Sequence, residues 1–143
     1  CGEVGAITGL ITVLVDGDDM DEPITDAARG ILDGHIILSR KIAAQGHFPA
    51  VDVLPSVSRL FREVTTEEHQ QSSVKLRSLL ATHAEIADLI QIGAYKTGTS
   101  PQVDRAVQII PAAKRFLQQK VHQISSWQET QEQLKTLAAA WPW

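Results

Sequence analysis

Residues 46–59 read GHFPAVDVLPSVSR, and the rest of the chain is arranged around this segment. Gly46 ends a short helical pattern, at the position where a helix favours a residue with positive φ. Phe48 directly precedes Pro49, and a short apolar run then leads to Arg59. The segment therefore holds an aromatic residue and an arginine at the two ends of an apolar run.

Two β-branched runs that precede this segment predict buried strands. Residues 6–15 (AITGLITVLV) are almost continuously apolar, which is typical of a strand covered on both faces, as in a parallel sheet. A solvated acidic turn, residues 16–19, follows this run. Residues 35–38 (HIIL) are too short for a helix and are bounded by glycine and serine, which predicts a second buried strand.

Short helical patterns alternate with these runs. Pro23 suits the start of a helix, and Thr25 and Asp26 offer oxygens that could cap it. Ser39 can cap a second helix over residues 40–45. The alternation of strand and helix predicts α/β architecture for this half of the chain.

Two parallel strands cannot form a stable sheet alone, because both faces and both edges need cover. We therefore expect them to be the end of a larger sheet. The chain does not begin with methionine, and we expect it to be a fragment or a processed product.

After about residue 62 the apolar residues recur with the period of a helix, and no strand is predicted. Thr65 and Glu68 form a capping box, and Gly93 ends the helix that follows. One face of this helix carries Leu76, Leu79, Leu80, Ile86, Leu89 and Ile90. Residues 62–143 are thus predicted to be all-helical, and residues 1–61 to form the α/β part.

Two further helices are predicted in the second half. Ser100 and Pro101 supply a cap and a first-turn proline, and Pro111 should break or kink the helix that they begin. Ser125 and Gln128 form the capping box of a last helix. Its apolar side carries Leu134, Leu137 and Trp141.

The composition is that of a globular protein with a small net charge. Of the 143 residues 43% are apolar, and the formal net charge is −4, so we expect no general affinity for nucleic acid. No apolar run approaches the roughly 20 residues that a membrane-spanning helix needs. Cys1 is the only cysteine, which excludes a disulfide within the chain and favours a reducing compartment.

The histidines do not predict a metal site. None of the five shows the paired spacing of metal ligands on a helix, and the single cysteine cannot complete a site. His83 falls on the apolar face of its predicted helix, where a packed residue is the better interpretation. We therefore assign no metal ligands to this chain.

Three segments together resemble the ATPases of flagellar export and type III secretion, within the rotary ATPase superfamily. They are residues 14–23 (LVDGDDMDEP), residues 32–41 (LDGHIILSRK) and residues 46–59. The resemblance implies the C-terminal part of such an ATPase. Residues 1–61 would be the end of a RecA-like P-loop nucleotide core, and residues 62–143 would form a helical-bundle domain. The chain as a whole is then expected to be predominantly helical.

The phosphate-binding loop pattern G-x-x-x-x-G-K-[ST] does not occur in the sequence. In the ATPases that the chain resembles, this loop, its lysine, the metal-binding strand end and the catalytic glutamate all come earlier. The resemblance therefore implies that ATP and Mg²⁺ bind the full-length protein, with the metal ligands outside these residues. The 143 residues alone are expected to be inactive.

The same resemblance assigns a catalytic role to Arg59. Residues 56–59 (SVSR) match the string whose arginine reaches into the nucleotide site of the neighbouring subunit, as an arginine finger in trans. A permanent, planar cation suits the charge that develops on the γ-phosphoryl group. The other interpretation is a surface arginine in an ordinary salt bridge.

Two aromatic residues are implied to stack on the adenine ring. Phe48 stands where the family places an aromatic directly before a proline, and Trp127 stands near the position of a second aromatic. Core packing is the alternative for both residues.

The resemblance also implies function and partners. The full-length protein would be a homohexamer that hydrolyses ATP to energise protein export, in the cytoplasm and peripheral at the inner membrane. Its partners would be a central-stalk coiled coil, regulatory subunits and chaperone–substrate complexes. Residues 95–100 (YKTGTS) lack the acidic run of rotary ATP synthases at this place, which favours the export branch.

Two other functions stay open from the sequence. One is a catalytic or regulatory subunit of a proton-translocating rotary ATPase. The other is a non-catalytic helical module that binds a partner coiled coil. A phosphate-binding loop upstream in the full reading frame would exclude the second.

Overall fold

Pro23 begins the first helix of the computed structural model, which describes residues 5, 7–15 and 22–142. This helix, α1 (Pro23–Ile31), belongs to a compact unit that ends at Leu32, and a second unit begins at Asp33. The two units are described separately below.

The start of α1 differs from the prediction. Glu22 is the N-cap residue, its side chain makes no capping hydrogen bond, and Pro23 occupies the first turn. Thr25 and Asp26 lie inside the helix, so the prediction that they cap it is wrong. Because Pro23 has no N–H and a φ that suits a helix, it starts α1 upstream of both residues.

The predicted strand over residues 6–15 is also wrong. Residues 7–15 form no strand, and all their apolar side chains except that of Val15 are exposed, with Ile7 at 101%, Leu10 at 93% and Leu14 at 92%. A β-branched run fits a strand only when a neighbouring strand supplies partners for its backbone. No described strand of this chain pairs with it. Cys1 and the predicted acidic turn, residues 16–19, lie outside the described residues.

The second unit contains a two-stranded sheet, formed by β1 (Gly34–Leu38) and β2 (Val51–Ser58). The prediction of a strand over residues 35–38 is confirmed, but the prediction that it is buried is wrong, because Ile36 is 69% exposed and Leu38 is 68% exposed. The predicted parallel pairing of residues 35–38 with residues 6–15 is wrong, because residues 7–15 form no strand, and β1 pairs instead with β2, in antiparallel orientation. β2 was not predicted as a strand: Asp52 and Pro55 interrupt its apolar pattern, and a proline argues against a central strand.

Helix α2 (Arg40–Ala44) lies in the connection between the strands; its predicted start is confirmed, and it ends one residue before the predicted end at Gln45. The Ser39 Oγ accepts a hydrogen bond from the Ile42 N–H at 3.4 Å, and Gly46 has a φ of +71°. The Ser39 N–H donates to the Ala50 carbonyl at 2.9 Å, which brings the two ends of the connection together.

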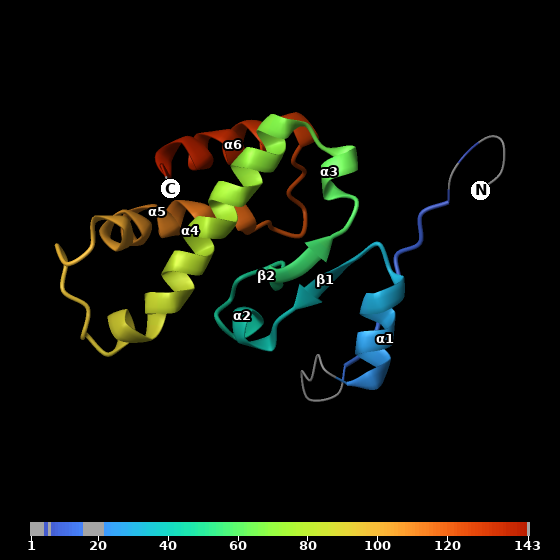
Figure 1. Ribbon diagram of the computed structural model, residues 1–143, viewed down its shortest axis with the longest axis horizontal. Helices are drawn as coiled ribbons and strands as arrows, with labels where there is room; N and C mark the ends of the chain where they lie inside the picture. The colour runs from blue at the N-terminus through green and yellow to red at the C-terminus, as the bar shows by residue number, and fades with distance from the viewer. Residues whose placement is uncertain (1–4, 6, 16–21, 143) are drawn as a thin grey trace. The chain divides into compact units, whose positions relative to one another are not determined.

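The rest of the second unit is helical, as predicted. It consists of α3 (Phe61–Val64), α4 (Glu67–Gln91), α5 (Pro101–Leu117) and α6 (Trp127–Ala140). Figure 1 shows the long helix α4 crossing α5 and α6.

The buried core lies between these three helices. Leu79 of α4 and Trp141, the C-cap residue of α6, are almost completely buried, and the Trp141 Nε1–H donates to the Ser78 Oγ at 3.3 Å. The core consists of Leu76, Leu79, Ala106, Ile109, Ile110, Ala113, Leu134 and Trp141. The predicted apolar face of α4 is buried only in part, because Leu89 is 46% exposed and Ile90 is 36% exposed.

Two predicted caps are displaced by one residue. Thr66, not Thr65, caps α4 by accepting a hydrogen bond from the His69 N–H, while the Thr65 hydroxyl donates to the Phe61 carbonyl and closes α3. Each threonine therefore serves a different helix, which the spacing alone does not reveal.

Ser126 and Glu129, not Ser125 and Gln128, form the capping box of α6. The Glu129 carboxylate accepts a hydrogen bond from the Ser126 N–H at 2.9 Å. That bond lowers the pKa of Glu129, and a carboxylate also interacts better than an amide with the positive end of the helix dipole. These two effects favour the box that contains the charged residue.

Helix α5 begins at Pro101, and Ser100 caps it as predicted, with its Oγ accepting a hydrogen bond from the Val103 N–H at 3.4 Å. Gly93 follows the end of α4 with a φ of +69°, also as predicted. Of the break or kink predicted at Pro111, the break is wrong, because α5 continues through Pro111 to Leu117. The neighbouring Ile109, Ile110 and Ala113 are buried in the core, and this packing outweighs the missing hydrogen bond.

We expect Leu79→Ala to lower the free energy of unfolding by about 2–5 kcal/mol, because it opens a cavity at a buried position of α4. The matched control is Val74→Ala on the same helix, where Val74 is 63% exposed and the expected change is within about 0.5 kcal/mol. Urea unfolding followed by circular dichroism measures both. Equal losses in the two variants would contradict the described core.

The stability of the second unit should depend on the protonation of His83. Burial, and then the positive charge of Lys114, lower the pKa of His83 below its usual 6.5. Just below pH 6.5 the unfolded chain therefore binds this proton and the folded chain does not, so stability rises with pH through that window. We expect the wild type to lose more stability than His83→Gln between about pH 7 and pH 5.5. Parallel pH profiles of urea unfolding for the two proteins would disprove this.

Candidate functional site

Arg59 directly follows β2, and its backbone is fixed to the start of β1. The Arg59 N–H donates to the Asp33 carbonyl at 2.7 Å, and the preceding Ser58 pairs with Gly34. A Cβ at Gly34 would lie 2.5 Å from the Val57 carbonyl oxygen, so only glycine allows this approach of the two strands. The hairpin therefore fixes the backbone of Arg59, while its side chain is exposed.

A bulge interrupts the ladder shortly before the end of β2. Ile37 pairs with Asp52 and His35 pairs with Val57, so a single residue of β1 faces four residues of β2. We call these four, residues 53–56, the β2 bulge. The carbonyl groups of such a bulge have no partners in the ladder and need donors from elsewhere.

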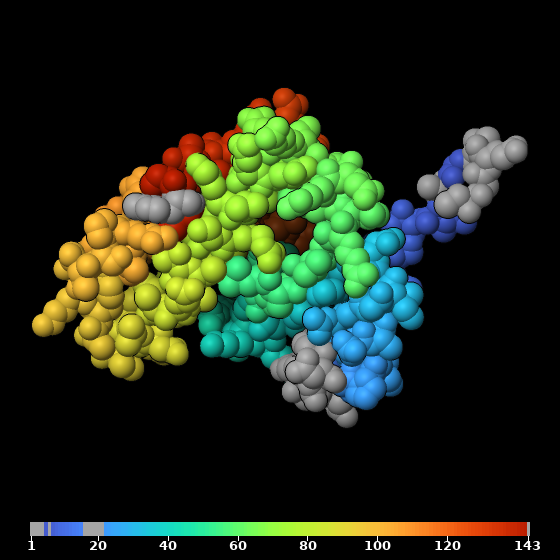
Figure 2. Space-filling view, in the orientation of Figure 1, coloured from blue at the N-terminus to red at the C-terminus, as the bar shows by residue number. Residues whose placement is uncertain are grey.

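Arg77 of α4 supplies most of these donors. Its guanidinium donates three hydrogen bonds at 2.7, 2.7 and 3.2 Å, to the carbonyl oxygens of Val53, Leu54 and Ser56 respectively. In the space-filling view, the yellow-green atoms of α4 lie directly against the green atoms of β2 (Figure 2). One side chain of the helical half therefore holds three of the four carbonyl groups of the bulge.

Two side chains of the hairpin complete the arrangement. The His35 Nε2 lies 3.0 Å from the Pro55 carbonyl oxygen, the fourth of the bulge. The Ser56 Oγ accepts from the Ile37 N–H at 3.0 Å and donates to the Asp52 carbonyl. All four carbonyl groups of the bulge therefore have side-chain partners.

Sequence reasoning missed Arg77. It stands in a long helical pattern with no cap, glycine or proline near it, and an arginine there resembles any solvated helix residue. Its contacts lie 21 to 24 positions away in the chain. No local signal could have found them.

Phe48 lies at the other end of the segment and is 57% exposed. Its peptide bond to Pro49 is cis, and its carbonyl oxygen accepts a hydrogen bond from the Gln119 N–H at 2.9 Å. Gln119 belongs to the connection between α5 and α6. The Phe48 ring is thus no part of the buried core, and its backbone is tied to the helical half.

Trp127 is the first residue of α6 and is 64% exposed. Its ring centroid lies 5.3 Å from that of His69, and the His69 ring meets Phe61 edge-on at 5.5 Å. Trp127 is therefore supported on one side by a row of rings. The connection over residues 118–126 begins beside Phe48 and ends at Trp127, so it joins the two aromatic residues that were predicted for one adenine pocket.

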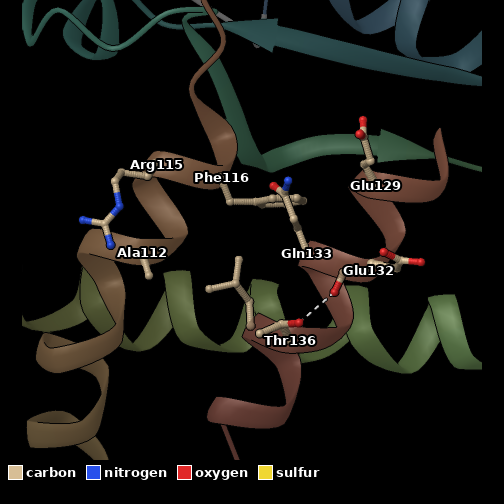
Figure 3. A pocket seen from close by; sticks show the side chains of 8 residues that line it. Ala112, Arg115, Phe116, Glu129, Glu132, Gln133 and Thr136 are labelled. Atoms are coloured by element: carbon tan, nitrogen blue, oxygen red, sulfur yellow. Dashed lines mark hydrogen bonds between the residues drawn. The ribbon is translucent and has the colours of Figure 1, made fainter. Parts of the chain in front are cut away.

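A cleft of about 510 Å³ lies between α5 and α6. Figure 3 shows the Phe116 ring beside Gln133, and Glu129 and Glu132 on α6. Arg115 from α5 also lines the cleft. None of the predicted site residues contributes to it.

The loop before α5 is held by Asp104. The Tyr95 hydroxyl donates to the Asp104 Oδ1 at 2.9 Å, and the Gly98 N–H donates to the Oδ2 at 2.8 Å. Desolvation and the Asp104 carboxylate raise the pKa of Tyr95 above its usual value. Residues 95–100, which lack an acidic run, therefore form an ordered turn.

Within the described part of the chain, no three His, Cys, Asp or Glu side chains lie close enough together to hold a metal ion. Among the same residues, no helix is long and apolar enough to span a membrane.

Two family profiles match the chain. Residues 65–136 match the family described as "T3SS EscN ATPase C-terminal domain". Residues 1–58 match the "ATP synthase alpha/beta family, nucleotide-binding domain".

Individual relatives agree with these profiles. The flagellum-specific ATP synthase of Bacillus subtilis is 53% identical over 117 residues, which are 82% of this chain and 27% of that protein. The structure of the assembled ATPase EscN from the type III secretion system of enteropathogenic E. coli matches with a TM-score of 0.83 and 39% identity, over 88% of this chain and 31% of the other. EscN in complex with its central stalk EscO matches with a TM-score of 0.75 and 40% identity, over 81% and 29%. The chain thus spans less than a third of the length of these relatives.

Proposed function

The chain belongs to the family of type III secretion and flagellar export ATPases and corresponds to the C-terminal portion of such a protein. We propose that the full-length protein hydrolyses ATP to energise protein export. The observation that carries the proposal is the placement of Arg59. It stands at the exposed end of a strand whose backbone is fixed by hydrogen bonds, and the resemblance of residues 56–59 to the string of these ATPases supports its role as an arginine finger.

In this proposal residues 1–61 are the end of the nucleotide-binding core, and residues 62–143 are the C-terminal helical domain. The two profile matches end at residue 58 and begin at residue 65, on either side of this boundary. The buried core formed by α4, α5 and α6 supports a helical domain with its own interior.

Arg59 acts as an arginine finger in trans. Its guanidinium carries a charge at every physiological pH and presents a planar set of donors that suits phosphoryl oxygens. Such a group neutralises the charge that develops on the γ-phosphoryl oxygens during transfer. The side chain is exposed beyond β2 and lies outside the buried core of this chain, as a residue that acts on a neighbouring subunit requires.

ATP and Mg²⁺ are the proposed cofactors, and residues of this chain fit the adenine ring of ATP. Phe48 and Trp127 expose aromatic rings outside the core, as stacking on a flat base requires. They would hold the adenine between them and supply binding rather than chemistry. The residues that hold the phosphates and the metal are proposed to lie in the part of the full-length protein that precedes this chain.

The proposed assembly is a homohexamer in the cytoplasm, peripheral at the inner membrane, with a central-stalk coiled coil, regulatory subunits and chaperone–substrate complexes as partners. The EscN structures are of an assembled ATPase and of its complex with a central stalk, which supports the homo-oligomer and the stalk partner in this proposal. The match of residues 65–136 to the secretion family favours this function over a proton-translocating subunit or a helical interaction module.

We expect Phe48→Ala in the full-length protein to weaken nucleotide binding. Loss of one stacking face worth about 1–3 kcal/mol corresponds to a roughly 5- to 150-fold higher dissociation constant. Phe48→Tyr should have little effect, because it keeps the ring. Titration with a fluorescent ATP analogue measures the affinity.

The control is Ile36→Ala, an exposed apolar residue of β1 that is 69% exposed and has no proposed contact with adenine. An unchanged affinity in Phe48→Ala, or an equal loss in Ile36→Ala, would remove Phe48 from the pocket.

We expect Arg59→Ala to leave nucleotide binding intact and to lower the turnover of the hexamer by about 10³–10⁵-fold, as in other systems with a finger. Arg59→Lys should not restore the rate fully, because an ammonium lacks the planar fork. Arg62→Ala, which removes an exposed arginine from the next helix, is the control and should retain turnover.

Mixed rings test the action in trans. A subunit with a disabled phosphate loop cannot turn over but still carries Arg59, whereas the Arg59→Ala subunit has a sound site of its own. Mixing the two should restore activity that neither has alone. If mixing restores nothing, Arg59 serves its own subunit and the proposal in trans is wrong.

A further inference from the structure

The β2 bulge lies between the two proposed nucleotide contacts of the segment. Phe48 precedes it by five positions and Arg59 follows it by three. On the Phe48 side, the pairs Leu38 with Val51 and Ile37 with Asp52 hold the strand to β1. On the Arg59 side, two residue pairs and the hydrogen bond from the Arg59 N–H hold it. The path of the chain between these anchors depends on partners outside the ladder.

The guanidinium of Arg77 supplies those partners. Its Nη1 bridges the carbonyl oxygens of Val53 and Ser56, at 2.7 and 3.2 Å, and its Nη2 donates to Leu54 at 2.7 Å. The first and last residues of the bulge are thus tied to one nitrogen. Hydrogen bonds from a charged donor are the stronger kind, and a planar group that makes three of them fixes orientation as well as distance.

We propose that Arg77 is a positioning residue for Arg59: by holding the β2 bulge, it sets the position from which Arg59 reaches the phosphoryl group. This inference rests on the proposed function of Arg59. Arg77 itself contacts neither nucleotide nor phosphate in this role, because its donors are directed to the backbone of β2. It acts through the short stretch of strand between Ser56 and Arg59.

The expected effect follows from this indirect role. Without the guanidinium, three carbonyl groups lose their donors, and the bulge relaxes toward water or toward a different register. The residue pairs that follow the bulge, His35 with Val57 and Gly34 with Ser58, then no longer have a fixed position. A displacement of about 1 Å in a reacting group is enough to lower a rate by on the order of 100-fold.

The test uses the full-length ATPase. We expect Arg77→Ala to lower kcat by about 10- to 100-fold. The KM for ATP should change by less than about twofold, because only a transition-state interaction is lost. Arg77→Lys should give an intermediate kcat, since a single ammonium cannot reproduce the fork over three oxygens. It also serves as the second variant if the alanine protein does not assemble.

Arg105→Ala is the matched control. The Arg105 Nε donates to the Ala140 carbonyl at 3.1 Å, so this variant also removes an arginine that joins two elements through a backbone oxygen, but within the helical half. It should retain normal kcat. A similar loss of kcat in Arg105→Ala, or an Arg77→Ala enzyme in which KM rises as kcat falls, would show a general structural effect and overturn the inference.

A double-mutant cycle decides whether Arg77 acts through Arg59. If it does, the Arg59→Ala/Arg77→Ala enzyme turns over no more slowly than Arg59→Ala alone. Additive losses would overturn the inference. If Arg59→Ala keeps normal turnover, the proposed function fails and this inference fails with it. If Arg59→Ala loses turnover and Arg77→Ala keeps it, only this inference is wrong.

Discussion

The carbonyl groups of a bulged strand need hydrogen-bond donors, and in this chain one arginine meets most of that need. Four residues of β2 leave the ladder together, and Arg77 reaches across from α4 to three of their carbonyl oxygens. The resulting link is specific in a way that apolar packing is not, because the guanidinium has a fixed plane and fixed donors. The hairpin is therefore docked on α4 in one orientation, and α4 in turn is fixed by the core that it shares with α5 and α6.

This link explains why the compact unit that begins at Asp33 contains both the hairpin and the helices. The proposed domain boundary near residue 62 follows the change from strand to helix along the sequence, whereas the compact unit follows contacts in space. The two divisions describe different properties. A two-stranded hairpin is at best marginally stable alone, so packing on α4 supplies the cover that further strands would otherwise provide.

The features that could be predicted from the sequence depend on residues within a few positions of one another. Ser39 caps α2, Ser100 caps α5, and Gly46 and Gly93 adopt positive φ where helices end. The strand over residues 6–15, by contrast, was inferred from apolar character, which does not say whether a partner strand exists. The antiparallel pairing of β1 with β2 and the contacts of Arg77 could not be predicted either, because their partners lie 13 to 24 positions apart. In the candidate site, the identities of Phe48, Arg59 and Trp127 came from a resemblance, whereas the contacts that tie Phe48 and the strand before Arg59 to the helical half came from the structure.

The helical half holds both ends of the segment over residues 46–59. The Gln119 N–H holds the Phe48 carbonyl at one end, and Arg77 holds the bulge near the other. The two donors belong to different parts of the helical half, the α5–α6 connection and α4. If the helical half moves as one body, it carries the base-stacking ring and the arginine together, and the geometry of the segment is kept. If α4 moves relative to the α5–α6 connection, the two ends are displaced by different amounts. The core that α4 shares with α5 and α6 opposes this second kind of motion, so the helical half holds both ends of the segment as one packed body.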